Sequence, residues 1–193
     1  MMPGPAHDRV GIELYIDIVN KIVSISGHNS QSIQGFATTR FHRPGVRSKQ
    51  ADQALGPSTR VGWDAWPSLV IEVGYSERLN GLRMDAEWWL INSAGKTKFA
   101  IIIKIKRNPF TIHIECWKMI PPTRRQTRHT PARTPHSIQK FDIDSVGVVA
   151  SASSELSIPY LCIFDEDHDD ATNVVFTKAE LSSFALRVFS LLQ

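Results

Sequence analysis

Apolar and polar residues recur along the chain with two different spacings, and each spacing predicts a type of element. Between Arg9 and Ser26 the apolar side chains fall three and four positions apart, which favours a helix; because many are β-branched, a strand in part of this stretch is the alternative. Residues 31–42 and 48–55 alternate as strands do. Residues 69–73 form a short apolar run interrupted only by Glu72, which predicts a buried strand.

Helices and strands are also predicted to alternate in the second half of the chain. Residues 78–92 carry two apolar stripes at helical spacing, one of them formed by Met84, Trp88 and Ile91, so we expect this helix to be well covered. Residues 96–106 are apolar on both faces at their centre, which favours a strand inside a sheet. The pattern ends with a half-exposed strand (110–117), a strand (156–164) and a terminal helix that begins at a Thr177–Glu180 capping box.

This order of elements predicts an α/β (or α+β) fold, in which helices flank a small mixed central sheet and an extra strand and helix follow at the C-terminus. A length of 193 residues suits a single domain over residues 1–193. We expect residues 1–8 to be a disordered N-terminus. Residues 119–140 are rich in Pro, Arg, Thr and His and poor in apolar side chains, so we expect a basic loop insertion there.

Charge is distributed unevenly, although the net charge of +3 does not by itself indicate a nucleic-acid-binding protein. No acidic residue occurs from Cys116 to Phe141. Such a segment is usually an ordinary solvated loop, and its functional alternative is contact with the phosphates of nucleic acid, DNA more than RNA, or a nuclear-import patch. The candidate phosphate-binding residues of the loop are Arg124, Arg125, Arg128 and Arg133.

The sequence does not indicate a disulfide-bonded, zinc-binding, secreted or membrane-spanning protein. The two cysteines lie in apolar runs, which favours buried thiols in a reducing compartment over a disulfide. No Cys or His cluster has the spacing of a zinc site, the N-terminus lacks the features of a signal peptide, and no apolar run is long enough to span a membrane. We therefore expect an intracellular protein, cytoplasmic or nuclear, with no membrane partner; the oligomeric state is left open.

Glu72 is the residue on which the functional hypothesis depends. A carboxylate in a buried strand is costly unless a cation or hydrogen bonds compensate it, so it is either a structural carboxylate or a metal ligand. Asp52 lies on the preceding predicted strand, and two carboxylates on adjacent strands can share one Mg²⁺ (or Mn²⁺). Such an ion activates water and stabilises the charge of a phosphodiester under attack. For Asp52 the alternative is a solvated acid near a turn.

The succession of a helix, a hairpin with an Asp, a strand with a Glu and a second helix resembles the PD-(D/E)XK restriction-endonuclease-like fold, with its αβββαβ core. The chain is also similar to a group of fungal proteins with this predicted fold and to the bacterial Uma2-type nuclease-like proteins. The resemblance covers about residues 8–118. The stretches that carry it are Gln50-Ala-Asp52, Trp66 to Glu77, Asp85 to Leu90, the isoleucine-rich strand to Lys106, and Ile112 to Trp117.

The resemblance implies a magnesium-dependent nuclease with Asp52 and Glu72 as metal ligands and Glu13 as an assisting acid. The family's lysine should stand two residues after the second acid, where this chain has Gly74. A basic residue displaced to another element would then orient the attacking water, and Arg83 is the candidate within the following helix. Lys104 and Lys106 are candidates for this role and for phosphate binding. The alternative function is a catalytically inactive member that binds nucleic acid or protein.

Overall fold

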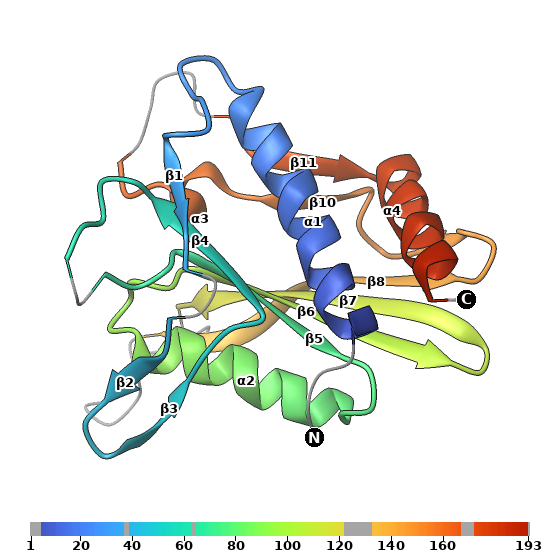
Figure 1. The fold of residues 1–193 in the computed structure, drawn as a ribbon, viewed down its shortest axis with the longest axis horizontal. Coiled ribbons are helices and arrows are strands. Elements are labelled where there is room, and N and C mark those ends of the chain that lie inside the picture. Colours follow the sequence, from blue (N-terminus) through green and yellow to red (C-terminus); the bar gives the residue numbers. More distant parts are fainter. Residues whose placement is uncertain (1–4, 37–38, 63–64, 122–132, 167–171, 193) are drawn as a thin grey trace.

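A seven-stranded mixed sheet runs through the protein in the strand order β1-β4-β5-β6-β7-β8-β9 (Figure 1). The computed structural model describes residues 5–36, 39–62, 65–121, 133–166 and 172–192. The helices are α1 (Pro5–Val23), α2 (Leu79–Asn92), α3 (Tyr160–Ile163) and α4 (Lys178–Leu191). The strands of this sheet are β1 (Ile33–Gly35), β4 (Gln53–Pro57), β5 (Leu69–Gly74), β6 (Phe99–Arg107), β7 (Phe110–Ile120), β8 (Thr134–Asp144) and β9 (Val149–Ala150).

Among the described strands of this sheet, only the central pair is parallel. Strands β1, β4 and β5 are antiparallel neighbours, β5 and β6 are parallel, and β6 to β9 are antiparallel again. A parallel pair needs a crossover, and α2 supplies it between β5 and β6. The mixed α+β architecture with helices on both sides of the sheet confirms the predicted fold class. The elements α1, β1, β4, β5, α2 and β6 occur in the predicted αβββαβ order, with a hairpin inserted between β1 and β4.

Two hydrophobic layers cover the two faces of the sheet. On one face α1 packs on β5, and α4 and a small antiparallel sheet of β10 (Glu155–Ile158) and β11 (Val174–Thr177) complete the hydrophobic core that contains Leu69, Ile71 and Val73 of β5. On the other face α2 packs on Val70, the neighbouring side chain of the same strand. Because side chains alternate along a strand, Glu72 faces α2, as the sequence pattern predicts.

A separate hairpin stands beside α2 (Figure 1). It consists of β2 (Phe41–Arg43) and β3 (Val46–Lys49), which pair only with each other in the described chain. Phe41 anchors it, since its buried ring contacts the rings of Trp66 and Trp89 at centroid distances of 5.0 and 5.4 Å. The predicted strands at 31–42 and 48–55 are therefore each divided between the hairpin and the central sheet.

Three predicted boundaries are wrong. Helix α1 begins at Pro5, within the segment expected to be disordered, and proline suits a first helical position. The expected loop 119–140 overlaps β7 and β8, which pair antiparallel from Thr111 opposite Asp144 to Ile120 opposite Thr134. The predicted strand 156–164 ends at Ile158 and continues as α3. No helix in the described ranges is long and apolar enough to cross a membrane.

Strand β8 was not predicted from the sequence because most of its side chains are polar. The strand lies half-exposed beside β7, and only Phe141 and Ile143 on it are fully buried, so most of its residues need not be apolar. Both cysteines are free thiols; Cys116 is buried and Cys162 is half-buried, as the sequence favours.

Candidate active site

Glu72 lies in the middle of β5, where every residue is buried, and only 4% of its surface is exposed. Its Oε1 atom accepts a hydrogen bond of 2.5 Å from Nε1 of Trp89 and lies 3.3 Å from Nζ of Lys49. Burial raises the pKa of Glu72 above its usual range; the positive charge of Lys49 opposes this effect and the negative charge of Asp52 adds to it. The carboxylate is thus held by two donors in an environment that favours a cation nearby.

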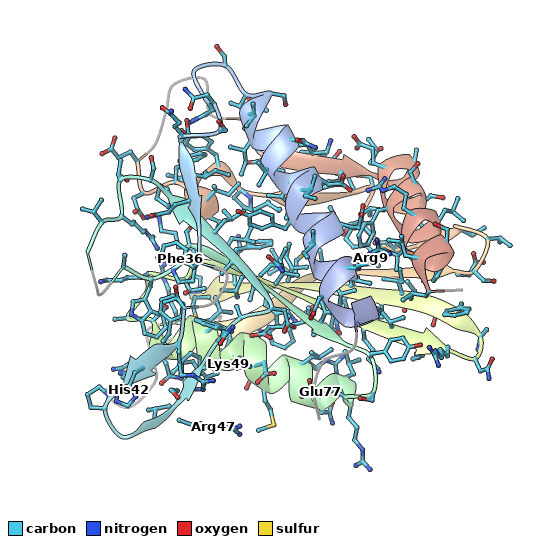
Figure 2. The ribbon with its side chains drawn as sticks, in the orientation of Figure 1. Arg9, Phe36, His42, Arg47, Lys49 and Glu77 are labelled. Atoms are coloured by element: carbon cyan, nitrogen blue, oxygen red, sulfur yellow. The ribbon has the colours of Figure 1, made fainter. Side chains whose placement is uncertain are left out.

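Lys49 is the basic residue of this site, and sequence reasoning missed it. It ends β3 and reaches from the hairpin toward α2, where Nζ also lies 2.7 Å from Oδ1 of Asp85 (Figure 2). Burial would lower the pKa of Lys49, but Glu72 and Asp85 outweigh it and raise the pKa, which keeps the ammonium charged. The sequence carries only one signal for this residue, its position three residues before Asp52.

Asp52 immediately precedes β4 and is half-buried beside β5. Its Oδ2 atom accepts a hydrogen bond of 2.7 Å from the backbone N–H of Val73, the residue after Glu72. Its charge also contributes to the raised pKa of Glu72. The structure therefore brings the two predicted metal ligands to the same region of adjacent strands, and Asp52 points toward β5.

The absence of a lysine at Gly74 has a steric explanation. A Cβ atom added to Gly74 would lie 2.7 Å from Cδ1 and 3.1 Å from Cγ of Leu82, a buried residue on α2. Contacts this short require Leu82 to move, so α2 occupies the space that a side chain on this strand position would need. With that position closed, the ammonium group next to Glu72 comes from a different strand.

The other predicted catalytic residues lie elsewhere. Glu13 is on α1, which covers the opposite face of the sheet, and its Oε2 atom lies 3.3 Å from Nε of Arg187 on α4. Arg83 turns from Glu72 toward Glu115, to which it donates two hydrogen bonds of 2.6 and 3.1 Å. Neither residue joins Asp52 and Glu72, because their charged partners hold them in other places.

The predicted nucleic-acid-binding residues are dispersed. Lys104 donates a 2.6 Å hydrogen bond to the backbone oxygen of Tyr75, and Lys106 is exposed two residues further along β6. Arg133 is exposed just before β8. Arg124, Arg125 and Arg128 lie outside the described residues, so their predicted role stays a prediction.

A second buried carboxylate, Glu115 on β7, lies two strands from Glu72 on the same face of the sheet, since Ile102 of β6 pairs with both residues. Besides Arg83, it is contacted at 3.0 Å by Nε2 of His113 and by Nε1 of Trp117. Burial would raise its pKa, but hydrogen bonds from His113 and Arg83 outweigh burial and hold the pKa at about 2. Glu115 is therefore charged, and its partners balance this charge. Its ion pair with Arg83 links α2 to the sheet.

A cleft of about 380 Å³ opens between the β2–β3 hairpin and α2, above Lys49. Arg40 and Arg47 of the hairpin region lie on its wall, and in the described ranges neither forms an ion pair. The acidic residues of the wall are Glu77 and Asp85, and Asp85 is paired with Lys49. The two unpaired guanidinium groups make this wall suitable for an anionic ligand.

The donors present fit a magnesium ion shared with a substrate. Within the described residues no group of three or more His, Cys, Asp or Glu side chains is placed to hold a metal. Mg²⁺, however, is usually bound by one or two carboxylates, with waters and substrate phosphate oxygens completing the octahedron. Asp52 and Glu72 supply two such carboxylates. Burial is the main cause of the raised pKa of Glu72 and the negative charge of Asp52 adds to it, so a nearby divalent ion would favour the ionised form.

No protein-family model matches the chain, and a search of curated proteins finds no match to its sequence. Function is therefore inferred from the site itself.

Proposed function

We propose that the protein is a magnesium-dependent nuclease in which Asp52, Glu72 and Lys49 act together on a phosphodiester. The observation that carries this proposal is the position of Lys49, whose Nζ lies 3.3 Å from Glu72 in the absence of a lysine on β5. Two carboxylates and one lysine are the side chains that the resemblance to PD-(D/E)XK nucleases requires. The lysine reaches the site from the hairpin, an origin that the sequence did not reveal.

Each residue has a role that its contacts support. Asp52 and Glu72 would hold the divalent ion, which when bound lowers the pKa of a coordinated water and stabilises the negative charge that develops on the phosphate. Lys49 donates from a fixed position, because Glu72 and Asp85 hold its ammonium from two sides. It would orient the attacking water and neutralise charge at the phosphorus. Arg40 and Arg47 would bind neighbouring phosphates on the wall of the cleft.

The test is a cleavage assay with labelled DNA and RNA, single- and double-stranded, in Mg²⁺ or Mn²⁺. We expect cleavage by the wild type, none in EDTA, and loss in Glu72→Gln and in Lys49→Ala while circular dichroism shows a folded protein. Matched controls are Glu155→Gln on β10 and Lys178→Ala on α4, which change the same residue types on the far side of the sheet. Cleavage that survives Glu72→Gln would disprove the proposal.

A second candidate function is binding without turnover. Trp89 and Lys49 both reach Oε1 of Glu72 and already compensate the buried carboxylate, as in a purely structural role. In that case the cleft binds nucleic acid, the affinity falls with added salt, and no metal gives cleavage. The same assay, combined with a binding titration, separates the two candidates.

A further inference from the structure

The outer face of α2 carries an apolar stripe that the rest of the described chain covers only in part. Met84 is 69% exposed and Ile91 is 52% exposed, and Trp88, which lies between them at helical spacing, is half-buried. We expected the whole stripe to be covered, and for Met84 and Ile91 that prediction is wrong. Trp88 also lines the cleft that contains Arg40, Arg47 and Lys49. An aromatic ring thus borders the same cavity as two guanidinium groups that form no ion pair with the described residues.

The ring of Trp88 is fixed by its neighbours. It is nearly parallel to the ring of Trp66, with a 25° angle between the planes and 6.0 Å between the centroids, and it meets Trp89 edge-on at 5.1 Å. The rings of Trp66 and Trp88 are therefore already stacked, and a further flat ring placed on Trp88 would extend the stack. A platform that is rigid before binding loses little conformational entropy when a base stacks on it.

The hairpin wall opposite is equally well anchored. Nη1 of Arg43 lies 3.4 Å from the backbone oxygen of Ile91 and 3.3 Å from that of Asn92, which ties β2 to the end of α2. Figure 2 shows His42 and Arg47 on the hairpin beside α2. Arg40 contacts an uncharged group, with Nη1 3.4 Å from Oγ of Ser48. The cleft thus has an aromatic side held by ring contacts, and a cationic side on a hairpin that Arg43 ties to α2.

We propose that this cleft binds single-stranded nucleic acid, with an unpaired base stacked on Trp88 and the adjoining phosphates on Arg40 and Arg47. A base within a duplex has both faces covered by its neighbours, so only a single strand or an extruded base can present a face to Trp88. The strand would pass over Lys49, which lines the cleft and contacts Glu72. The inference therefore names the substrate class of this site, and it rests on the proposed function for the cleavage step after binding.

The test measures binding in EDTA, where cleavage does not interfere. Fluorescence anisotropy compares fluorescein-labelled oligonucleotides of one mixed sequence, as a single strand and as the matching duplex. We expect the single strand to bind about tenfold tighter, and Trp88→Ala to weaken its binding about tenfold, the loss of one base–aromatic stack. Trp88→Phe retains most of the affinity, and Leu186→Ala, an exposed apolar change on α4, leaves it unchanged.

Arginine variants provide an independent measurement if Trp88→Ala does not fold. Arg40→Gln and Arg47→Gln each reduce the slope of log affinity against log salt by about one and keep the strand preference. Equal affinity for single strand and duplex, or unchanged affinity in Trp88→Ala and both arginine variants, would overturn the inference. Binding of a single strand without cleavage in Mg²⁺ overturns the nuclease proposal alone, whereas cleavage of duplex with no strand preference overturns this inference alone.

Discussion

Nζ of Lys49 lies 3.3 Å from Oε1 of Glu72, and the two residues come from strands that belong to different sheets. The contact joins the β2–β3 hairpin to the buried carboxylate of β5. Lys49 supplies the positive charge that a lysine at position 74 would have supplied, where Leu82 occupies the space of a side chain. The proposed activity depends on this pair, which also adds to the contacts of Phe41 and Arg43 that hold the hairpin.

A double-mutant cycle on this pair measures the coupling. Lys49→Met leaves Glu72 buried without its nearest cation, and we expect the free energy of unfolding to fall by about 2–4 kcal/mol. In the Glu72→Gln background the same change costs less, because a neutral amide needs no cation. Urea denaturation of the four proteins gives the coupling free energy. Equal effects of Lys49→Met in both backgrounds would show that the contact contributes nothing to stability.

Substitutions of Asp52 separate its structural role from its charge. Asp52→Asn can still accept the hydrogen bond from the N–H of Val73, so we expect its free energy of unfolding to stay within about 1 kcal/mol of wild type. Asp52→Ala loses that acceptor and is less stable. Both variants lose cleavage if the carboxylate holds a metal. Full activity in Asp52→Asn would remove Asp52 from the proposed site.

A side chain at Gly74 is expected to destabilise the fold. Gly74→Ala brings a Cβ to 2.7 Å from Cδ1 of Leu82, so the free energy of unfolding should fall by about 1–3 kcal/mol. Combining it with Leu82→Ala relieves the clash, so Gly74→Ala costs less in that background than in the wild type. Thermal denaturation of the single and double variants checks this. Additive losses in the double variant would contradict a steric origin.

Arg83 is expected to affect stability and leave catalysis intact. Arg83→Met removes the two-pronged contact to fully buried Glu115, and we expect a loss of about 2–4 kcal/mol. The cleavage rate per folded molecule, measured well below the melting temperature, should remain near wild type because Arg83 does not reach Glu72. A rate loss as large as that of Lys49→Ala would return Arg83 to the candidate catalytic residues.

The stability of the fold should depend on pH through His113 and Glu115. The hydrogen bond to Glu115 raises the pKa of His113 above its usual 6.5, against burial, and the bond to Asp142 adds to the rise. The imidazolium therefore stabilises the fold fully below about pH 6.5, and this contribution is lost as pH rises through the raised pKa. The opposite sign applies to Glu115, whose contribution is complete above about pH 4.5 and is lost as pH falls toward its pKa of about 2.

Urea denaturation from pH 3 to pH 9 measures both the acidic and the alkaline limb of the plot of unfolding free energy against pH. In His113→Gln we expect the loss of stability above about pH 6.5 to become smaller, while the loss below about pH 4.5 remains. His136→Gln, an exposed histidine on the same sheet, is the matched control. An unchanged alkaline limb in His113→Gln would show that His113 does not stabilise the fold by its charge.

Local spacing in the sequence was enough to predict the elements whose residues share one environment along their whole length. Residues 69–73 form a buried strand with Glu72 toward the following helix, and Thr177 and Glu180 form the capping box of α4. These features depend on residues a few positions apart, which a sequence displays directly. The sequence also placed Asp52 on the strand that precedes Glu72, and the strands β4 and β5 are neighbours in the sheet.

Only the tertiary structure decided which charges meet. Lys49 reaches Glu72 because a separate hairpin folds beside α2, and Arg83 reaches Glu115 because Glu72, Ile102 and Glu115 align across three strands. Strand register and hairpin direction result from long-range packing, and neither has a local signal in the chain. The exposed stripe of α2 has the same cause: periodicity shows that a face is apolar, whereas the presence of a covering layer depends on where distant segments pack.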